Sequence, residues 1–196
     1  MKTLLPNVRL RLLRKKTRKQ AENPEWFEQR IGRLTASKHH EIYTKVNTIM
    51  ASRSKKVHKT TPLVATILGK DKDWSHLPAF QYGREHEKDA KDAFIKLESL
   101  KHRSFTVKEC GLYVHPQYPY IAASPDGLCV CRCCPDMVLE IKCPSSIENL
   151  PIQEGWNKTE FLEMRGESIC LKTSHKYYTQ VQGQLALAKC RPHICD

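Results

Sequence analysis

The sequence contains no apolar run that approaches the ~20 consecutive residues a transmembrane helix requires. Its first 20 residues include no Asp or Glu, and they lack the apolar stretch of a secretory signal peptide. No internal repeat is visible, and no low-complexity segment follows the basic start. These absences argue against a membrane protein and a repeat architecture. They predict an intracellular chain with no membrane partner, nuclear if the host is eukaryotic.

Acidic residues are outnumbered by basic residues in the chain as a whole. The 196 residues include 33 Lys and Arg against 21 Asp and Glu, a net charge of +12. A surplus of this size favours a polyanionic partner such as nucleic acid, although a basic protein without one is the alternative. The run Arg14–Lys19 is typical of a nuclear address, a phosphate-binding arm or a solvated tail. We therefore predict a basic tail over residues 1–23 and one domain over residues 24–196.

The nine cysteines are an odd number, so disulfides alone would leave one of them unpaired. Without a secretory signal, we interpret them as reduced thiols or metal ligands. Cys129, Cys131, Cys133 and Cys134 lie close together in the sequence, and they raise the possibility of a zinc or iron–sulfur site. Their spacing contains no CxxC pair, and adjacent cysteines rarely bind the same zinc ion. Free thiols at a hairpin tip are therefore the preferred prediction.

Hydrophobic periodicity predicts helices and short strands in a mixed order. The best helical pattern covers residues 79–100, where Ala90, Phe94 and Leu97 form an apolar stripe. The order of elements predicts an α/β (α+β) fold with a mixed central sheet flanked by helices. The other predicted helices cover residues 24–30, from 35 or 37 to 45, 62–68 and 174–189. The predicted strands cover residues 105–107, 111–114, 120–123, 128–130 and 137–142.

The chemistry-bearing pattern is an Asp on one predicted strand and an acid and a lysine on the next. Glu140 and Lys142 are two residues apart, so in a strand they project from the same face while Ile141 points into a core. Asp126 begins the preceding strand of the same hairpin. Two carboxylates beside one ammonium suit a hard divalent cation and an attacking water. The pattern predicts a metal-dependent phosphodiesterase, with a surface hairpin carrying a salt bridge as the alternative.

Hydrolysis of a phosphodiester requires an activated water and neutralisation of the charge on the phosphate. We expect Asp126 and Glu140 to hold Mg²⁺ with the backbone carbonyl of Ile141. Glu87 adds a third carboxylate, directly or through a water, because Mg²⁺ keeps several waters. Lys142 is placed to hold the attacking water or a phosphate oxygen.

Five motifs in the same order give this sequence a resemblance to the YqaJ-like viral recombinase family. The match spans residues 24–188. Any one motif alone is common, whereas five in order are specific. They are Trp26–Ser37, Gly83–Ala90 (GREHEKDA), Ala123–Leu128 (ASPDGL), Leu139–Pro144 (LEIKCP) and Tyr177–Gln182 (YYTQVQ).

The resemblance implies a restriction-endonuclease-like core that degrades duplex DNA from a free end with Mg²⁺ or Mn²⁺, 5′ to 3′ in lambda-like members. It implies that the product is used for recombination or repair, together with a single-strand annealing or recombination protein. By matching position, it assigns Asp126 and Glu140 as metal ligands, Lys142 as the water-orienting lysine and Glu87 as a supporting acid. It places Gln180 near the nucleophile or the phosphate, and Arg30 with Ser37 at the terminal 5′-phosphate.

Departures from the family leave alternatives open. The hairpin between Asp126 and Glu140 carries extra cysteines, and the long C-terminal part of lambda-like members has no counterpart here. A homo-oligomer is therefore in doubt, and the apolar residues near Ile194 are consistent with a fragment that lacks a final strand. A catalytically inactive DNA-binding module and an endonuclease on the same core both remain compatible with the motifs.

Overall fold

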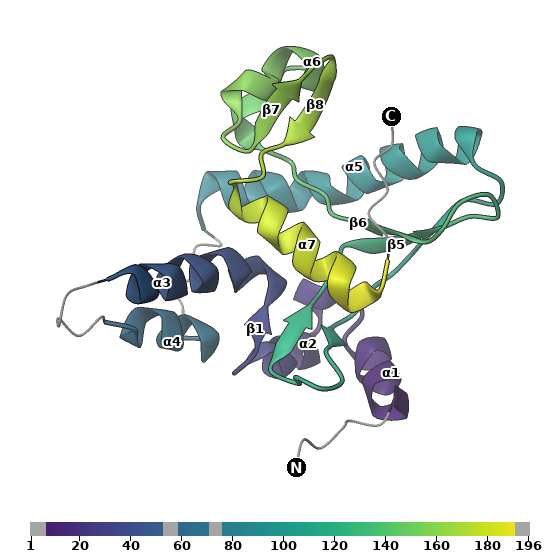
Figure 1. The fold of residues 1–196 in the computed structure, drawn as a ribbon. Helices are drawn as coiled ribbons and strands as arrows, with labels where there is room; N and C mark the ends of the chain where they lie inside the picture. The colour runs from purple at the N-terminus through teal and green to yellow at the C-terminus, as the bar shows by residue number, and fades with distance from the viewer. Residues whose placement is uncertain (1–6, 53–58, 71–75, 191–196) are drawn as a thin grey trace.

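The computed structural model describes residues 7–52, 59–70 and 76–190, which form the helices and strands shown in Figure 1. The helices are α1 (Asn7–Lys16), α2 (Pro24–Arg30), α3 (His39–Ala51), α4 (Thr61–Ile67), α5 (Pro78–Lys101), α6 (Ile152–Gly155) and α7 (Lys176–Ala188). The strands are β1 (Leu34–Thr35), β2 (Thr106–Lys108), β3 (Tyr113–Val114), β4 (Ile121–Ala123), β5 (Gly127–Val130), β6 (Met137–Leu139), β7 (Leu162–Arg165) and β8 (Ser168–Leu171). This mixed composition confirms the predicted α+β class.

The described strands form three small sheets. The first has the order β1-β4-β3, with β1 parallel and β3 antiparallel to β4. The second has the order β2-β5-β6 and is antiparallel, and β7 pairs only with β8. Pro125 lies between β4 and β5 and has no N–H to donate to a ladder. The chain therefore changes from the first sheet to the second directly before Asp126.

Two clusters of buried apolar side chains hold the first and second sheets to helices. In one, Phe105, Cys129 and Met137 pack against Phe94 and Ile95 of α5. In the other, Leu112, Val114 and Ala122 pack against Leu10 and Leu13 of α1 and Trp26 of α2. Each cluster therefore joins one sheet to helices that come from other parts of the sequence.

Much of the basic segment near the N-terminus forms helix α1, which packs closely against the backbone just before β3. Thr17, which is fully buried, donates to the Leu13 carbonyl and accepts from the Leu112 N–H, both at 2.8 Å. A Cβ atom at Gly111 would lie 2.1 Å from the Arg14 carbonyl oxygen. Glycine at position 111 therefore permits the close approach of α1.

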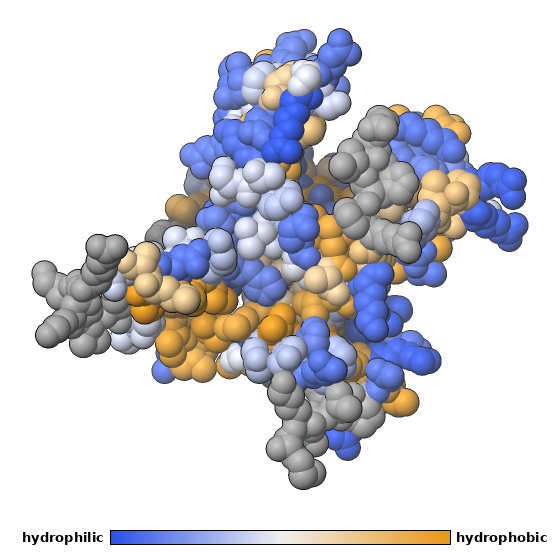
Figure 2. Space-filling view, in the orientation of Figure 1, coloured by the Kyte–Doolittle hydropathy of each residue, from blue (hydrophilic) through white to orange (hydrophobic). Residues whose placement is uncertain are grey.

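Helix α7 contacts β3, β4, β6 and α3, and it crosses the centre of the molecule in Figure 1. Gly183 lets this helix approach the start of α3 and the 3₁₀ turn Ala36–Lys38, because a Cβ atom there would lie 2.5 Å from His39 Nδ1 and 3.3 Å from Ala36 Cβ. Helices α3 and α4 lie together on one side, while α6, β7 and β8 project as a small lobe. Figure 2 shows hydrophobic side chains on the surface around α4. Val64 in α4 and Leu68 directly after it are exposed.

The structure departs from the sequence predictions at several places. Strand β6 ends at Leu139, so Glu140–Lys142 follows the strand instead of extending it, and Ile141 lines a cavity instead of a core. Helix α3 runs six residues beyond the predicted end at Lys45, to Ala51. Helix α6 and the hairpin β7–β8 were not among the predicted elements.

Some sequence predictions fall outside the described residues. The polar and basic composition of residues 47–60 predicts a connector, and residues 71–78 are predicted to form a loop. The middle of this connector, most of this loop and the apolar end near Ile194 lie outside the described residues. Among the described helices, none combines the length and apolar character needed to cross a bilayer.

Candidate active site

The predicted pair of carboxylates converges at one end of the β5–β6 hairpin. Gly127 pairs with Leu139 in the ladder, so Asp126 and Glu140 flank the same register pair. The Asp126 N–H donates to the Leu139 carbonyl at 3.0 Å, and the Ile141 N–H donates to Asp126 Oδ2 at 2.6 Å. The backbone of one strand thus fixes the carboxylate that comes from the other.

Glu140 is the most heavily hydrogen-bonded carboxylate of the site, with a side chain only 9 % exposed. Its Oε1 accepts from Lys142 Nζ and from Gln180 Nε2, and its Oε2 accepts from Gln184 Nε2 at 2.6 Å. Both glutamines lie on the polar stripe of α7, one turn apart. The sequence analysis predicted a role for Gln180 and missed Gln184, although Gln184 follows Gln180 by one helical turn on the same face.

Gln184 is fully enclosed, at 1 % exposure. Its Oε1 is a buried acceptor without a hydrogen-bond partner among the described residues. An unsatisfied buried acceptor is costly unless a donor such as water reaches it. The orphaned oxygen therefore fits a site that takes up a hydrated group beside Glu140.

Lys142 lies between the two carboxylates and an aromatic ring. Its Nζ donates to Glu140 and to the Ile141 carbonyl, the latter at 3.1 Å, and it lies 5.1 Å from the centre of the Tyr177 ring. Burial acts to lower the pKa of Lys142, but the charge of Glu140, its hydrogen bond and the charge of Asp126 leave the pKa above its ordinary value. The side chain is therefore an ammonium group.

Asp126 has the most perturbed acidity in the site. Burial raises its pKa first, the neighbouring Glu140 charge raises it further, and Glu87 adds a smaller contribution. The Ile141 N–H and Lys142 oppose these effects, and the resulting pKa is about 7. The two carboxylates are difficult to ionise together, because their negative charges repel each other. A divalent cation bound between them would stabilise the doubly ionised pair.

Helix α5 brings two further charged groups to the hairpin. Lys91 Nζ donates to the Asp126 carbonyl at 2.7 Å, a contact that the sequence did not predict. Glu87, one turn earlier, lines a cavity of about 870 Å³ together with Lys142, Cys143 and Tyr177. The predicted carboxylates and lysine thus lie together, with Glu87 on the wall of the same cavity.

A second cavity, of about 370 Å³, contains the predicted phosphate-binding arginine. The Arg30 guanidinium carbon lies 4.0 Å from the centre of the Trp26 ring, and burial lowers the pKa of Arg30 to about 10. Phe27 lines both cavities, so they are neighbours. The other lining residues include Arg33, Thr35 and Lys38.

Ser37, predicted beside Arg30, does not line this second cavity. Its side chain is exposed, and its Oγ lies 3.2 Å from Oγ1 of Thr35, which does line the cavity. The described structure therefore connects Ser37 to the arginine cavity through Thr35.

One correction concerns the cysteines. Cys129, grouped with three others in the sequence, is 2 % exposed and packs with Phe105 and Met137. The alternation of β5 turns Cys129 into this apolar cluster, because side chains along a strand point to opposite faces in turn. It is therefore a core residue and lies outside any group of metal ligands.

Two comparisons with known proteins, of the sequence with family profiles and of the fold with solved structures, agree with this geometry. The sequence profile of the YqaJ-like viral recombinase domain matches residues 25–191. The crystal structure of an alkaline exonuclease, LHK-Exo, from Laribacter hongkongensis is 25% identical with a TM-score of 0.52, covering 84% of this chain and 68% of that one. The structure of LHK-Exo in complex with dAMP is 28% identical to this chain, with a TM-score of 0.50. The match covers 85% of this chain and 69% of that one. A search of curated protein sequences found no match.

Proposed function

The chain belongs to the YqaJ-like viral recombinase family, and from this premise we propose that it is a divalent-metal-dependent DNA exonuclease. The observation that carries the proposal is the convergence of Asp126, Glu140 and Lys142 at one end of a hairpin. Its structural relative LHK-Exo is an alkaline exonuclease, and one of its structures holds dAMP. The proposed products are nucleotides and single-stranded tails for recombination or repair.

The donor set suits Mg²⁺ or Mn²⁺. The Asp126 and Glu140 carboxylates and the Ile141 carbonyl are hard oxygen ligands, and Glu87 adds a carboxylate directly or through a water. The raised pKa of Asp126 and the orphaned Gln184 oxygen both support a hydrated cation here. When bound, such a cation neutralises charge on the phosphate and lowers the pKa of a bound water.

The residues of the chain orient the reacting groups. Gln180 and Gln184 hold Glu140 from one side, and the Ile141 N–H holds Asp126 from the other. An ammonium group has three donors, of which Lys142 uses two on Glu140 and the Ile141 carbonyl. Its third N–H is available to the attacking water or to a phosphate oxygen.

The arginine cavity supplies a site for a DNA end. Arg30, Arg33 and Lys38 line one small cavity beside the apolar ring of Phe27. A guanidinium fork matches the geometry of a terminal phosphate, and Thr35 with Ser37 adds hydroxyl groups. Because Phe27 also lines the cavity of Glu87 and Lys142, a 5′-phosphate bound at Arg30 would place the strand beside the carboxylates. This arrangement supports 5′ to 3′ degradation of duplex DNA.

The test is incubation of the purified chain with linear and closed-circular duplex DNA in Mg²⁺, beside the variant Lys142→Ala. We expect loss of the linear DNA alone, by the parent alone, with DNA binding retained by the variant. Cutting of the circle would instead establish an endonuclease on the same core. DNA binding in EDTA without cleavage of either DNA in Mg²⁺ would establish a binding module.

A further inference from the structure

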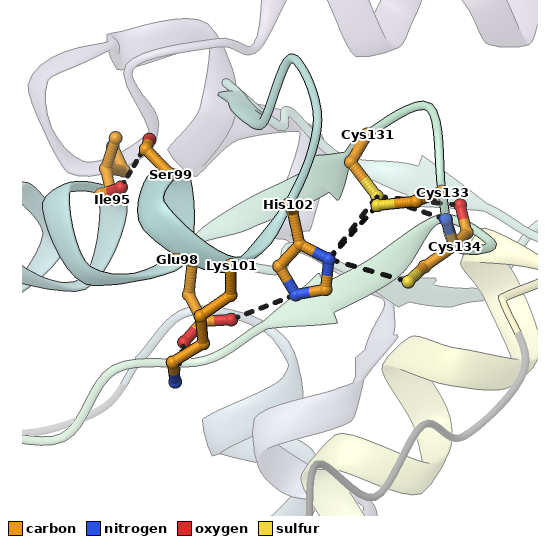
Figure 3. A network of polar contacts seen from close by, with 8 residues as sticks. All are labelled: Ile95, Glu98, Ser99, Lys101, His102, Cys131, Cys133 and Cys134. Carbon is orange, nitrogen blue, oxygen red and sulfur yellow. Dashed lines mark hydrogen bonds and ion pairs between the residues drawn. The ribbon is translucent and has the colours of Figure 1, made fainter.

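A second group of metal-ligating side chains lies at the opposite end of the same hairpin. Cys131, Cys133 and Cys134 lie in the connection between β5 and β6, and His102 follows the last residue of α5 (Figure 3). One ligand atom from each of the four residues lies within 4.8 Å of all the others. Figure 3 shows the imidazole and the three sulfurs pointing toward one another.

The spacing of these atoms matches a tetrahedral metal site. His102 Nδ1 lies 3.3 Å from Cys133 Sγ, 3.5 Å from Cys134 Sγ and 3.9 Å from Cys131 Sγ. The Sγ atoms of Cys131 and Cys133 are 3.5 Å apart. Zinc bonds of about 2.3 Å to sulfur and about 2.0–2.1 Å to nitrogen give tetrahedral edges of about 3.8 and 3.5 Å. The four atoms therefore have room for a zinc ion between them without a rearrangement of the backbone.

The surroundings of His102 prepare it as a ligand. Its Nε2 lies 3.2 Å from Oε2 of Glu98, whose side chain is only 11 % exposed. An Nε2–H that donates to Glu98 leaves the lone pair of Nδ1 toward the sulfurs, and metal-binding histidines commonly have such a carboxylate partner. Lys101 Nζ bonds the other Glu98 oxygen at 2.8 Å and keeps this carboxylate in place.

The connection between β5 and β6 is also held in a ligating conformation. The Cys134 N–H donates to Cys131 Sγ at 3.2 Å, which favours a thiolate at that sulfur. The Arg132 N–H donates to the Arg103 carbonyl at 2.9 Å, so the backbone of the loop is attached to the segment that directly follows α5. This loop conformation brings the adjacent Cys133 and Cys134 to the same point, against the expectation from their spacing.

We propose that His102, Cys131, Cys133 and Cys134 bind a structural zinc ion. Three thiolates and one imidazole are soft ligands that select zinc over Mg²⁺ or Mn²⁺. Four protein ligands leave no open position for a substrate, which is the arrangement of structural zinc sites. The ion is therefore distinct from any cation held by Asp126 and Glu140.

The proposed zinc joins the two elements that carry the active-site carboxylates. Helix α5 carries Glu87 fifteen residues before His102, which corresponds to about 22 Å along a helix. The β5–β6 hairpin carries Asp126 and Glu140 at one end and the cysteines at its tip. Fastening the tip to the end of α5 fixes the hairpin relative to the helix that supplies Glu87 and Lys91.

The experiment measures the metal content of the full chain purified without added metal, by mass spectrometry of the elements. We expect about one zinc per chain in the parent and at least fivefold less in Cys133→Ser, because three of four ligands bind weakly. Cys133 is exposed, so its substitution leaves the fold intact, which circular dichroism checks. Cys170→Ser is the matched control, because Cys170 lies in β8 and is not one of the four.

A second variant separates this site from the carboxylates. Asp126→Asn should retain the zinc. In a separate measurement, Co²⁺ added to the metal-free parent should give the absorption bands of tetrahedral cobalt with thiolate ligands. The same bands should be absent when Co²⁺ is added to Cys133→Ser. Zinc retained by Cys133→Ser, or lost from Asp126→Asn, would overturn the proposal. So would iron with acid-labile sulfide in place of zinc, or a parent that binds neither Zn²⁺ nor Co²⁺ at the thiols.

Discussion

Replacing Asp126 with asparagine should stabilise the metal-free chain in a pH-dependent way. The folded protein raises the pKa of this carboxyl from 3.8 to about 7, chiefly by burial and then by the charge of Glu140. A raised pKa means that the folded state keeps a proton that the unfolded state releases. The free energy of unfolding of the parent is therefore not reduced by Asp126 below about pH 4, where the carboxyl is protonated in both states. It falls as the pH rises from about 4 to about 7, because the unfolded state loses its proton first.

The magnitude follows from the size of the pKa change. A rise of about 3 pKa units, at about 1.4 kcal/mol each, costs the folded parent about 4 kcal/mol at pH 8. Asparagine has the same shape, and its oxygen still accepts from the Ile141 N–H, but it carries no charge to desolvate. The free energy of unfolding of Asp126→Asn should therefore exceed that of the parent by an amount that grows by about 1.4 kcal/mol per pH unit between about pH 4 and 7. Above about pH 7 this difference should level off.

The assay is urea unfolding of the parent and Asp126→Asn in EDTA at several pH values from 5 to 8. Asp92→Asn is the matched control, because Asp92 lies on the exposed face of α5 and pairs with Lys88 across one helical turn. Its effect should be small at every pH. A difference between parent and Asp126→Asn that does not change with pH, or a parent that is the more stable at pH 8, would refute the reasoning.

Three further predictions concern the supports of the site and the fold. Gln184→Leu removes a donor to Glu140 and should raise the Mg²⁺ concentration needed for half-maximal cleavage about 10–100-fold, whereas an unchanged metal requirement would contradict this positioning role. Arg30→Ala should slow degradation of 5′-phosphorylated duplexes selectively, and an equal loss on unphosphorylated ends would contradict a phosphate site. Gly111→Ala places a Cβ 2.1 Å from the Arg14 carbonyl oxygen and should destabilise the chain by about 1–3 kcal/mol, measured by urea unfolding. An unchanged unfolding midpoint would show that the docking of α1 contributes little.

The local parts of the site were predictable because they depend on spacing within one hairpin or one helix. Asp126 and Glu140 flank a single register pair, so a hairpin brings them together whatever surrounds it. Gln180 and Gln184 share one face of α7 for the same reason. The strand was nevertheless predicted too long, because a contact between Lys142 and Glu140 needs no strand conformation.

Other features depend on how distant segments dock, and no local pattern shows that. Lys91 reaches the Asp126 carbonyl only because α5 packs against the hairpin. His102 joins the cysteines only because α5 ends where the hairpin tip lies, about thirty residues along the chain. The hairpin β7–β8 did carry a signal, since Gly166, which adopts a positive φ, stands in a two-residue turn between two short runs that contain apolar residues. The domain boundary after residue 23 stays a prediction.

The most direct test of the proposed function is the order in which label leaves a linear duplex in Mg²⁺. One strand carries a label at its 5′-terminal nucleotide or, in a second preparation, at its 3′-terminal nucleotide, and the parent is compared with Lys142→Ala. The proposal predicts early release of the 5′ label as a mononucleotide by the parent and none by the variant. Early release of the 3′ label, internal fragments from either substrate, or equal release by Lys142→Ala would contradict it.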